Sequence, residues 1–283
     1  MLKIGIESSA YISLDNYKEG LKKLKAHGYD CIDYQEVARA DSECFTWDED
    51  KRRSYFINLK AYADAIGISF CQMHGLWPTN DKTEESRNAQ FDFYVKQLEI
   101  ANILGCPYLV IHPLMPYGWA QEEDSNYSWK INKEFFLKLL QYAERANVVI
   151  CLENIPVNMQ LGHISFVNQM VNEINSSFFK VCLDTGHANV MKDDLYQGIK
   201  ELGDNLRCVH IHDNKGRSDE HTCPYFGNID WDLLVLALKE IGYDGCISLE
   251  THISEKMFSE VKEEMQISLA KVAKCLAKKI SDC

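Results

Sequence analysis

The chain has 283 residues, a formal net charge of −12, 46% hydrophobic residues and 25% charged residues. This length fits one α/β barrel of ~250 residues, and the composition excludes an intrinsically disordered chain. No apolar run approaches the ~20 residues of a membrane-spanning helix, and the first seven residues lack a secretory apolar region, so we expect no membrane segment. The acidic balance disfavours a protein that coats nucleic acid, and we expect a small-molecule partner.

The cysteines indicate the compartment. There are eleven of them, an odd number, and none is arranged as a CxxC pair. Because no export signal precedes them, free thiols in a reducing cytoplasm are the expected state.

Short β-rich runs alternate with segments of helical period along the whole chain. The expected strands cover residues 2–8, 29–35, 68–75, 107–114, 148–155, 179–184, 206–212 and 246–251. The expected helices cover residues 15–27, a segment ending near 67, a long segment ending near 105, residues 133–147, 165–174, 195–202, 231–241 and a C-terminal segment. Gly28, Gly67 and Gly105 mark the ends of the first three helices.

Eight β/α units predict a fold of the α/β class, a (β/α)8 TIM barrel formed by a single domain over residues 1–283. A doubly wound open sheet is the alternative. Such a sheet usually carries a glycine-rich phosphate turn after its first strand, and the sequence Glu7-Ser8-Ser9-Ala10 offers none.

Metal-type side chains gather at the carboxyl ends of the expected strands, which meet at one mouth of a barrel. Buried acids and imidazoles that share one pocket need a cation, or one another, to offset their desolvation. The candidates are His74, His112, Glu153, Asp184, His187, His210, Asp219, His221 and Glu250, with His212 as a further histidine.

The chemistry of this set favours a divalent ion such as Mn²⁺ or Zn²⁺ over an iron–sulfur cluster, because it mixes carboxylates with imidazoles and has no thiolate at the mouth. Glu153 and Glu250 would approach the cavity from different sides. A metal that polarises a carbonyl, with one carboxylate removing the neighbouring proton and another returning a proton, is sufficient to isomerise or epimerise a ketose.

Four cysteines share the inward face of a strand with one of these ligands, three of them two residues earlier in the chain and Cys246 four residues before Glu250. We expect them to fill the barrel centre as small apolar side chains, and we assign no catalytic role to a cysteine. They are Cys151, Cys182, Cys208 and Cys246.

Several motifs carry a family resemblance. They are Leu152-Glu153-Asn154, Asp184-Thr185-Gly186-His187, His210-Ile211-His212-Asp213, Asp219-Glu220-His221 with Pro224 to Trp231 after it, and Ser248-Leu249-Glu250. In this order they resemble the xylose-isomerase-like barrel superfamily, which contains sugar phosphate isomerases and epimerases, ketose 3-epimerases, inosose dehydratases and apurinic endonuclease IV.

The resemblance to the ketose 3-epimerases implies that Glu153, Asp184, His210 and Glu250 hold one divalent ion, and that the two glutamates also act as the acid/base pair. It implies a substrate contact for His187. That branch has an arginine shortly after the strand-seven histidine, and Arg217 lies nearby in a local sequence that does not match closely.

The resemblance to endonuclease IV implies a three-zinc site that adds His74, His112, His187, Asp219 and His221 to the same four ligands. Three features favour a sugar enzyme instead. The loop after His74 lacks the DNA-contacting segment of that enzyme, and no basic stripe lies near the mouth loops. The loops also carry aromatic side chains that suit the apolar faces of a sugar, namely Trp77, Tyr117, Trp119 and Tyr225.

The sequence therefore predicts a Zn²⁺- or Mn²⁺-dependent isomerase or epimerase of a sugar, sugar phosphate or polyol ketone that acts through an enediolate. Dehydration within the same chemistry and apurinic DNA incision remain as alternatives. A homo-oligomer is also open, because the apolar side chains of the terminal helix can pack on the barrel or on a partner. Those side chains are Ile267, Leu269, Val272 and Leu276.

Overall fold

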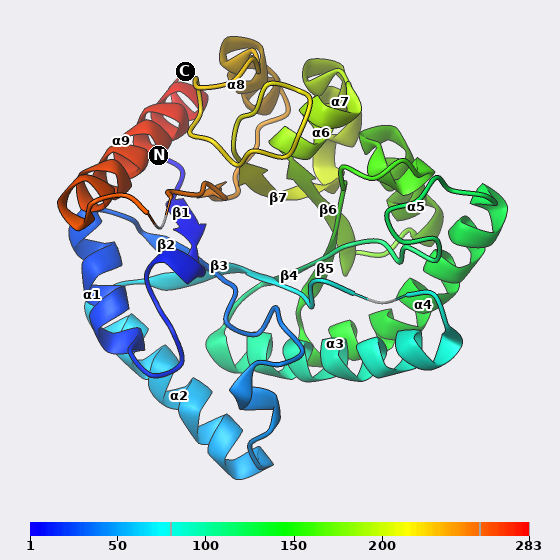
Figure 1. Ribbon diagram of the computed structural model, residues 1–283, viewed down its shortest axis with the longest axis horizontal. Coiled ribbons are helices and arrows are strands. Elements are labelled where there is room, and N and C mark those ends of the chain that lie inside the picture. The colour runs from blue at the N-terminus through cyan, green and yellow to red at the C-terminus, as the bar shows by residue number, and fades with distance from the viewer. Residues whose placement is uncertain (80, 255, 283) are drawn as a thin grey trace.

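The computed structural model describes residues 1–79, 81–254 and 256–282. Its central feature is a closed barrel of parallel strands that follow one another in chain order (Figure 1). The strands are β1 (Ile4–Glu7), β2 (Cys31–Tyr34), β3 (Ser69–His74), β4 (Tyr108–Ile111), β5 (Val149–Glu153), β6 (Phe179–Asp184), β7 (Leu206–Ile211) and β8 (Ile247–Leu249).

Helices surround the barrel as an outer ring (Figure 1). They are α1 (Tyr17–His27), α2 (Glu49–Ile66), α3 (Glu84–Leu104), α4 (Ser125–Ala146), α5 (Ile164–Ile174), α6 (Thr185–Met191), α7 (Leu195–Leu202), α8 (Trp231–Glu240) and α9 (Ser259–Ser281). Short 3-10 turns are η1 (Ser8–Ala10), η2 (Glu43–Phe45), η3 (Gln160–Gly162) and η4 (Gly203–Asn205). The predicted single-domain (β/α)8 barrel is confirmed.

The sheet closes through β1 and β8, where Ile4 pairs with Ile247. Between β6 and β7, Asp184 lies opposite His210. Because all the strands run in the same direction, this register brings the carboxyl ends of the strands to one edge of the barrel. Side chains from distant parts of the chain can therefore meet there.

Helix ends follow the local sequence. Gly28, Gly67 and Gly105 adopt the left-handed conformation directly after α1, α2 and α3, as predicted. Asn147 takes the same conformation after α4. The start of α4 was predicted eight residues too late, because Asp124 caps the helix by accepting hydrogen bonds from the backbone N–H groups of Asn126 and Tyr127.

The helix α6 was not predicted. It follows β6 without a loop, and Asp184 is its N-cap residue. The strand β8 ends at Leu249, so Glu250 lies just beyond the strand rather than within it.

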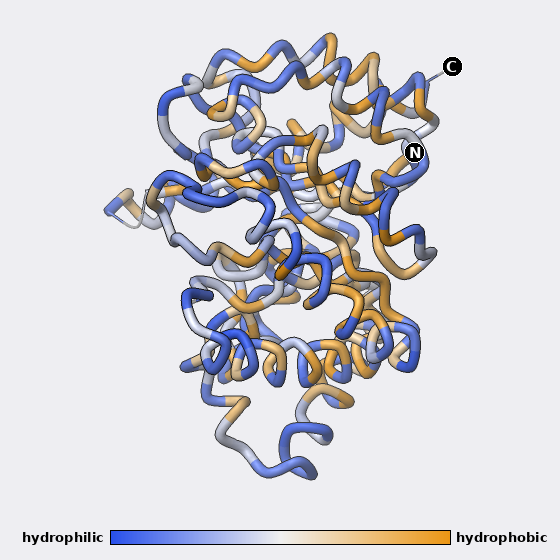
Figure 2. Tube along the Cα trace, turned by 90° about the vertical axis from the view of Figure 1, so that its right-hand side faces the viewer, coloured by the Kyte–Doolittle hydropathy of each residue, from blue (hydrophilic) through white to orange (hydrophobic). Residues whose placement is uncertain are grey.

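The main core lies between the strands and the ring of helices. Hydrophilic and hydrophobic residues recur along the helices, as expected of helices with one face on a core (Figure 2). The terminal helix α9 packs on β1 and β8, with Leu269 and Leu276 buried. The chain ends are joined where the backbone N–H of Leu2 donates to Ser281 Oγ at 3.1 Å. Among the described residues, no helix has the length and apolar character needed to cross a bilayer.

Candidate active site

Each of the eight strands places an acidic or imidazole side chain at or next to the carboxyl edge of the barrel. These side chains are buried or nearly so. In strand order they are Glu7, Asp33, His74, His112, Glu153, Asp184, His210 and Glu250. The predicted convergence of ligand-type residues from strands three to eight is thus present in the structure, and strands one and two add two carboxylates.

The centre of the cluster is the imidazole of His210. Its Nδ1 atom lies 2.9 Å from Glu153 Oε1 and 3.2 Å from Glu250 Oε2. Both His210 and Glu153 are fully buried, and the Glu250 side chain is 12% exposed. The two glutamates therefore approach one imidazole nitrogen, Glu153 from β5 and Glu250 from just beyond β8.

Asp33 holds the other side of this imidazole. Its Oδ2 atom lies 2.8 Å from His210 Nε2 and also accepts a hydrogen bond from Gln72 Nε2 at 2.9 Å. A carboxylate only accepts, so His210 Nε2 carries a proton here, and Nδ1 is left to face the glutamates. A carboxylate that orients a histidine in this way is common behind metal ligands.

A second group lies around the other oxygen of Glu153. Glu153 Oε2 is 3.2 Å from His112 Nε2 and 3.6 Å from His74 Nε2. The His74 ring stacks on that of His210 at 5.7 Å between centroids, and the Trp77 ring lies 4.5 Å from that of His112. Glu153 thus joins the central cluster to the histidines of β3 and β4.

Asp184 does not contact Glu153 or His210 by a hydrogen bond within the described part of the chain. Instead, Asp184 Oδ1 accepts from the backbone N–H of His187 at 2.6 Å, and Asp184 Oδ2 lies 3.0 Å from His212 Nε2. Gly186 makes room for this contact, because a Cβ there would lie 1.9 Å from His212 Cε1. The Asp-Thr-Gly-His motif therefore needs a glycine at position 186, because any larger side chain would collide with His212.

A third group forms around Asp219. Its Oδ2 atom lies 3.2 Å from His187 Nε2 and 2.9 Å from His221 Nε2. His221 is stacked between His212 and His252, at centroid distances of 4.1 and 4.4 Å. The predicted additional ligands thus form two groups. His74 and His112 lie beside Glu153, and His187, Asp219 and His221 lie together in the other group.

The two glutamates differ in protonation. Burial raises the pKa of Glu250 to about 8, and the attraction of His210 does not offset it. Burial would also raise the pKa of Glu153, but His210 and His112 outweigh burial and hold it well below its usual range. At neutral pH Glu153 is therefore ionised and Glu250 holds a proton.

Protonated imidazoles balance the remaining acids. Burial opposes the charge of His187, yet Asp184 and Asp219 raise its pKa to about 10. The pKa of His221 rises to about 9 against burial, because of Asp219 and Glu250. For His210, Glu250 and Glu153 outweigh burial and raise the pKa well above its usual value.

The donor set fits a divalent ion. Glu153 Oε2, Glu250 Oε2 and Asp33 Oδ1 are buried and accept no hydrogen bond from any residue that the structure describes. Buried oxygens without a hydrogen bond are costly to desolvate unless a cation or a ligand meets them, and two of these three already lie 3.2 Å from an imidazole nitrogen. Residues close enough to share an ion include three sets: His74, His210 and Glu250; His74, His112 and Glu153; and His187, His212, Asp219 and His221.

Metal uptake is expected to depend steeply on pH. A divalent ion must displace protons from Glu250, whose pKa is about 8, and from the neighbouring imidazoliums. Apparent affinity should therefore rise between pH 6 and 8 by about tenfold per pH unit for each proton released. Calorimetry in buffers of different ionisation enthalpy would count these protons. An affinity that is constant over this range would contradict the assignment of Glu250 as a ligand.

A cavity of about 520 Å³ opens from this cluster towards the loops after β1, β2 and β3, and its size suits a small ligand. Its ionisable lining is mainly acidic. The lining includes Asp15, Gln35, Glu36, Arg39, Asp41, Glu43, His74, Trp77 and Glu250. Arg39 forms an ion pair with Asp41, with its Nε atom 3.0 Å from Asp41 Oδ1.

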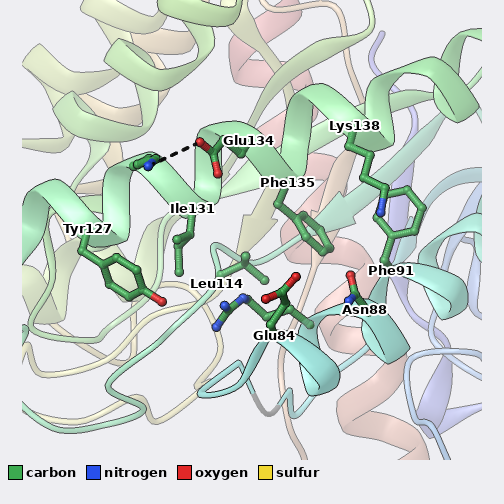
Figure 3. Close-up of a pocket in the computed structure, with 11 residues that line it drawn as sticks. Glu84, Asn88, Phe91, Leu114, Tyr127, Ile131, Glu134, Phe135 and Lys138 are labelled. Carbon is green, nitrogen blue, oxygen red and sulfur yellow. Dashed lines mark ion pairs between the residues drawn. The ribbon is translucent and has the colours of Figure 1, made fainter.

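Of the predicted substrate contacts, Trp77 and His187 lie at the mouth. Arg217 is exposed in the segment between β7 and α8, and no hydrogen bond or ion pair joins it to the mouth within the described residues. A separate cavity of about 370 Å³ lies outside the barrel between α3 and α4 (Figure 3). Its lining, which includes Phe91 and Phe135, contains none of the mouth residues.

Sequence reasoning missed Asp33, Glu7 and Gln35. Gln35 Nε2 lies 3.5 Å from Glu250 Oε1. Asp33 could have been found by the alternation that was applied to later strands, since it stands near the end of β2, two residues after Cys31. Its partner His210 lies 177 residues further along the chain, so the contact itself required the barrel.

The chain is similar in sequence to a sugar epimerase, to a probable endonuclease 4 and to an uncharacterized protein. D-psicose 3-epimerase of Ruminiclostridium cellulolyticum is 26% identical over 253 residues, covering 84% of this chain and 79% of the relative. A probable endonuclease 4 of Mycoplasmopsis agalactiae is 25% identical over 174 residues, or 58% of this chain and 60% of the relative. An uncharacterized protein of Sinorhizobium fredii is 25% identical, and the match covers 56% of its length.

Solved structures share the fold. A crystal structure of D-psicose 3-epimerase with D-tagatose from Clostridium cellulolyticum H10 superposes with a TM-score of 0.79 at 19% identity, over the whole of both chains. The structure of the IOLI protein with a binding zinc atom gives a TM-score of 0.75 at 21% identity, over 99% of this chain and 98% of that one.

The family model described as xylose isomerase-like TIM barrel matches residues 21–273. This range contains the seven ligand-type residues of strands two to eight and all of the motifs that suggested the resemblance. The chain belongs to the xylose isomerase-like TIM barrel family.

Proposed function

We propose that this protein is a divalent-metal-dependent isomerase or epimerase of a small ketose or polyol ketone. The observation that carries the proposal is the meeting of Glu153 and Glu250 at His210 Nδ1, with one oxygen of each carboxylate lacking a hydrogen bond among the described residues. The named relatives that act on sugars, and the neighbour that binds zinc, support it.

Glu153, Asp184, His210 and Glu250 would hold the ion, and Asp33 would orient His210. A divalent ion at this position supplies a Lewis acid that polarises a substrate carbonyl and acidifies the neighbouring C–H bond. Zn²⁺ and Mn²⁺ both suit a set of carboxylates and imidazoles.

The two glutamates would perform the proton transfers. Glu153 is ionised in the chain alone and can accept the proton from the carbon beside the carbonyl, while Glu250 can return one. Removal of that proton gives an enediolate. Reprotonation of the same carbon on its other face is epimerisation, and reprotonation of the other carbon is isomerisation. Loss of a β-hydroxyl group would instead be dehydration, which product analysis distinguishes.

The charge of the cavity favours a neutral substrate over a phosphorylated one. Besides Glu250, four acidic side chains line the cavity, and one of them, Asp41, is paired with its one arginine. Burial raises the pKa of Glu36 to about 7, so Asp15 and Glu43 carry most of the remaining negative charge. We therefore expect a neutral ketose to bind roughly tenfold or more tightly than its monophosphate, since like charges repel in a desolvated site. The test is to measure the inhibition constants of a ketose and of its monophosphate. Added salt should reduce the difference between the two constants, because it screens the repulsion. Tighter binding of the phosphate would contradict the expectation.

The same acidic lining argues against DNA incision. Nuclease affinity depends on lysine and arginine contacts to phosphates, and this cavity offers one arginine that is already paired. Incision of a duplex with an abasic site at low enzyme concentration would overturn the sugar proposal.

The proposal is tested by incubating protein loaded with Zn²⁺, and separately with Mn²⁺, with a panel of neutral ketoses and inososes, followed by chromatography of the products. Interconversion of one ketose pair that chelation abolishes and metal restores is the expected result. Absence of any conversion with the metal site saturated would count against it.

A further inference from the structure

Three thiols lie together at the end of the barrel opposite the mouth. Cys31 on β2, Cys71 on β3 and Cys246 just before β8 point their sulfur atoms at one another, and all three atoms lie within 4.8 Å of each other. The Sγ atoms of Cys31 and Cys246 are 3.1 Å apart. Each of the three precedes the mouth residue of its own strand, by two residues for Cys31 and Asp33, three for Cys71 and His74, and four for Cys246 and Glu250.

A glycine on β1 completes the arrangement. The position that a Cβ of Gly5 would take lies 3.1 Å from the sulfur of each of the three cysteines. The three sulfurs therefore pack against the Cα of Gly5, and any residue other than glycine would crowd them. The closeness of the sulfurs to one another is what a bound ion needs, since metal–sulfur bonds are about 2.3 Å long.

Solvent reaches this cluster. Cys71 and Cys246 are partly exposed, and both line a cavity of about 480 Å³ that is also lined by Lys3, Arg207 and Asp244. The two cations outnumber the one carboxylate and would offset part of the negative charge of several thiolates.

The other inward-facing cysteines differ from Cys71 and Cys246 in their exposure. Cys151, Cys182 and Cys208 form a buried group with Val110, and none of the three is partly exposed. They match the apolar filling predicted for them, whereas Cys246, for which the same role was predicted, lies with Cys31 and Cys71.

We propose that Cys31, Cys71 and Cys246 form a three-thiolate site for a soft cation such as Zn²⁺, separate from the oxygen- and nitrogen-rich site at the mouth. Thiolates prefer soft metals, and carboxylates with imidazoles do not share that preference. The proposal does not depend on the activity of the mouth.

The test is a titration with Cd²⁺ under anaerobic, reducing conditions, followed by the thiolate-to-metal charge-transfer absorption in the ultraviolet. Ions held only by oxygen and nitrogen do not give this band. We expect it to saturate at one equivalent of Cd²⁺ per chain. Cys71→Ser and Cys246→Ser, which change partly exposed residues, should each weaken this binding by about tenfold or more, because loss of a ligand costs at least as much as loss of a residue that orients one.

Two control variants make the result specific. Cys182→Ser removes a thiol that lies close to Glu153 and His210, so it reports any sulfur contribution to an ion at the mouth. Cys275→Ser changes an exposed cysteine on α9. Both should keep the full band, and circular dichroism should show that all variants are folded. A band that Cys182→Ser abolishes and Cys71→Ser leaves intact would overturn the proposal, as would the lack of any band at saturating Cd²⁺.

Discussion

Replacing Glu250 by glutamine is expected to lower kcat by ~10²–10⁴-fold on the substrate that the ketose panel identifies. The substitution keeps the size of the side chain but removes its ability to exchange a proton beside His210. Steady-state kinetics with saturating metal would measure the loss. Glu153→Gln should cause a loss of the same order, because both members of an acid/base pair are needed for one turnover.

The matched control is Glu201→Gln on the outer surface of α7, where the carboxylate contacts only Gln197 among side chains of the described residues. This change should leave kcat unaltered. Full turnover by Glu250→Gln would show that the proton transfers take place elsewhere in the protein.

Removing the carboxylate of Asp33 is expected to weaken metal binding at the mouth by about 10- to 100-fold. In Asp33→Ala the Nε2–H group of His210 loses its acceptor in a fully buried position, so the imidazole is no longer held with Nδ1 towards Glu153 and Glu250. The measurement is a competition titration against a chelator of known affinity.

Asp81→Asn is the control for this variant. It neutralises another buried carboxylate, one that accepts hydrogen bonds from Thr79 and from the backbone of Met115 and does not touch His210. Equal losses in the two variants would mean that Asp33 acts through general stability rather than by orienting His210.

The fold was predictable because local and long-range preferences agree. The helix ends at Gly28, Gly67 and Gly105 can be predicted from the sequence, because these positions adopt the left-handed conformation that glycine tolerates best. The helix α6 escaped prediction because it has seven residues, includes Gly186 and begins inside a motif that also carries the site. Its formation depends on the Asp184 cap and on packing in the barrel.

The candidate site was predictable in part. Strand ends from three to eight located His74, His112, Glu153, Asp184, His210 and Glu250, because parallel strands bring their carboxyl ends together. The sequence could not show how these residues pair. Asp184 meets His212 rather than Glu153, and this contact needs the space left by Gly186, which the alternation of side chains along a strand does not show.

The thiol cluster of Cys31, Cys71 and Cys246 could not be predicted from the sequence either. Alternation along single strands placed Cys246 beneath Glu250, but it did not show that Cys31 and Cys71 come from neighbouring strands to the same point. Only the closure of the barrel between β8 and β1 brings Cys246 beside Gly5.

The most direct test of the proposed chemistry is solvent deuterium exchange. Metal-loaded protein would be incubated with the ketose panel in D₂O, and the recovered sugars would be analysed by mass spectrometry. We predict incorporation of one deuterium on the carbon beside the carbonyl of the substrate, abolished in Glu153→Gln and Glu250→Gln. Conversion of a ketose without any deuterium in the product, or retention of exchange in both variants, would contradict proton transfer by this pair of glutamates.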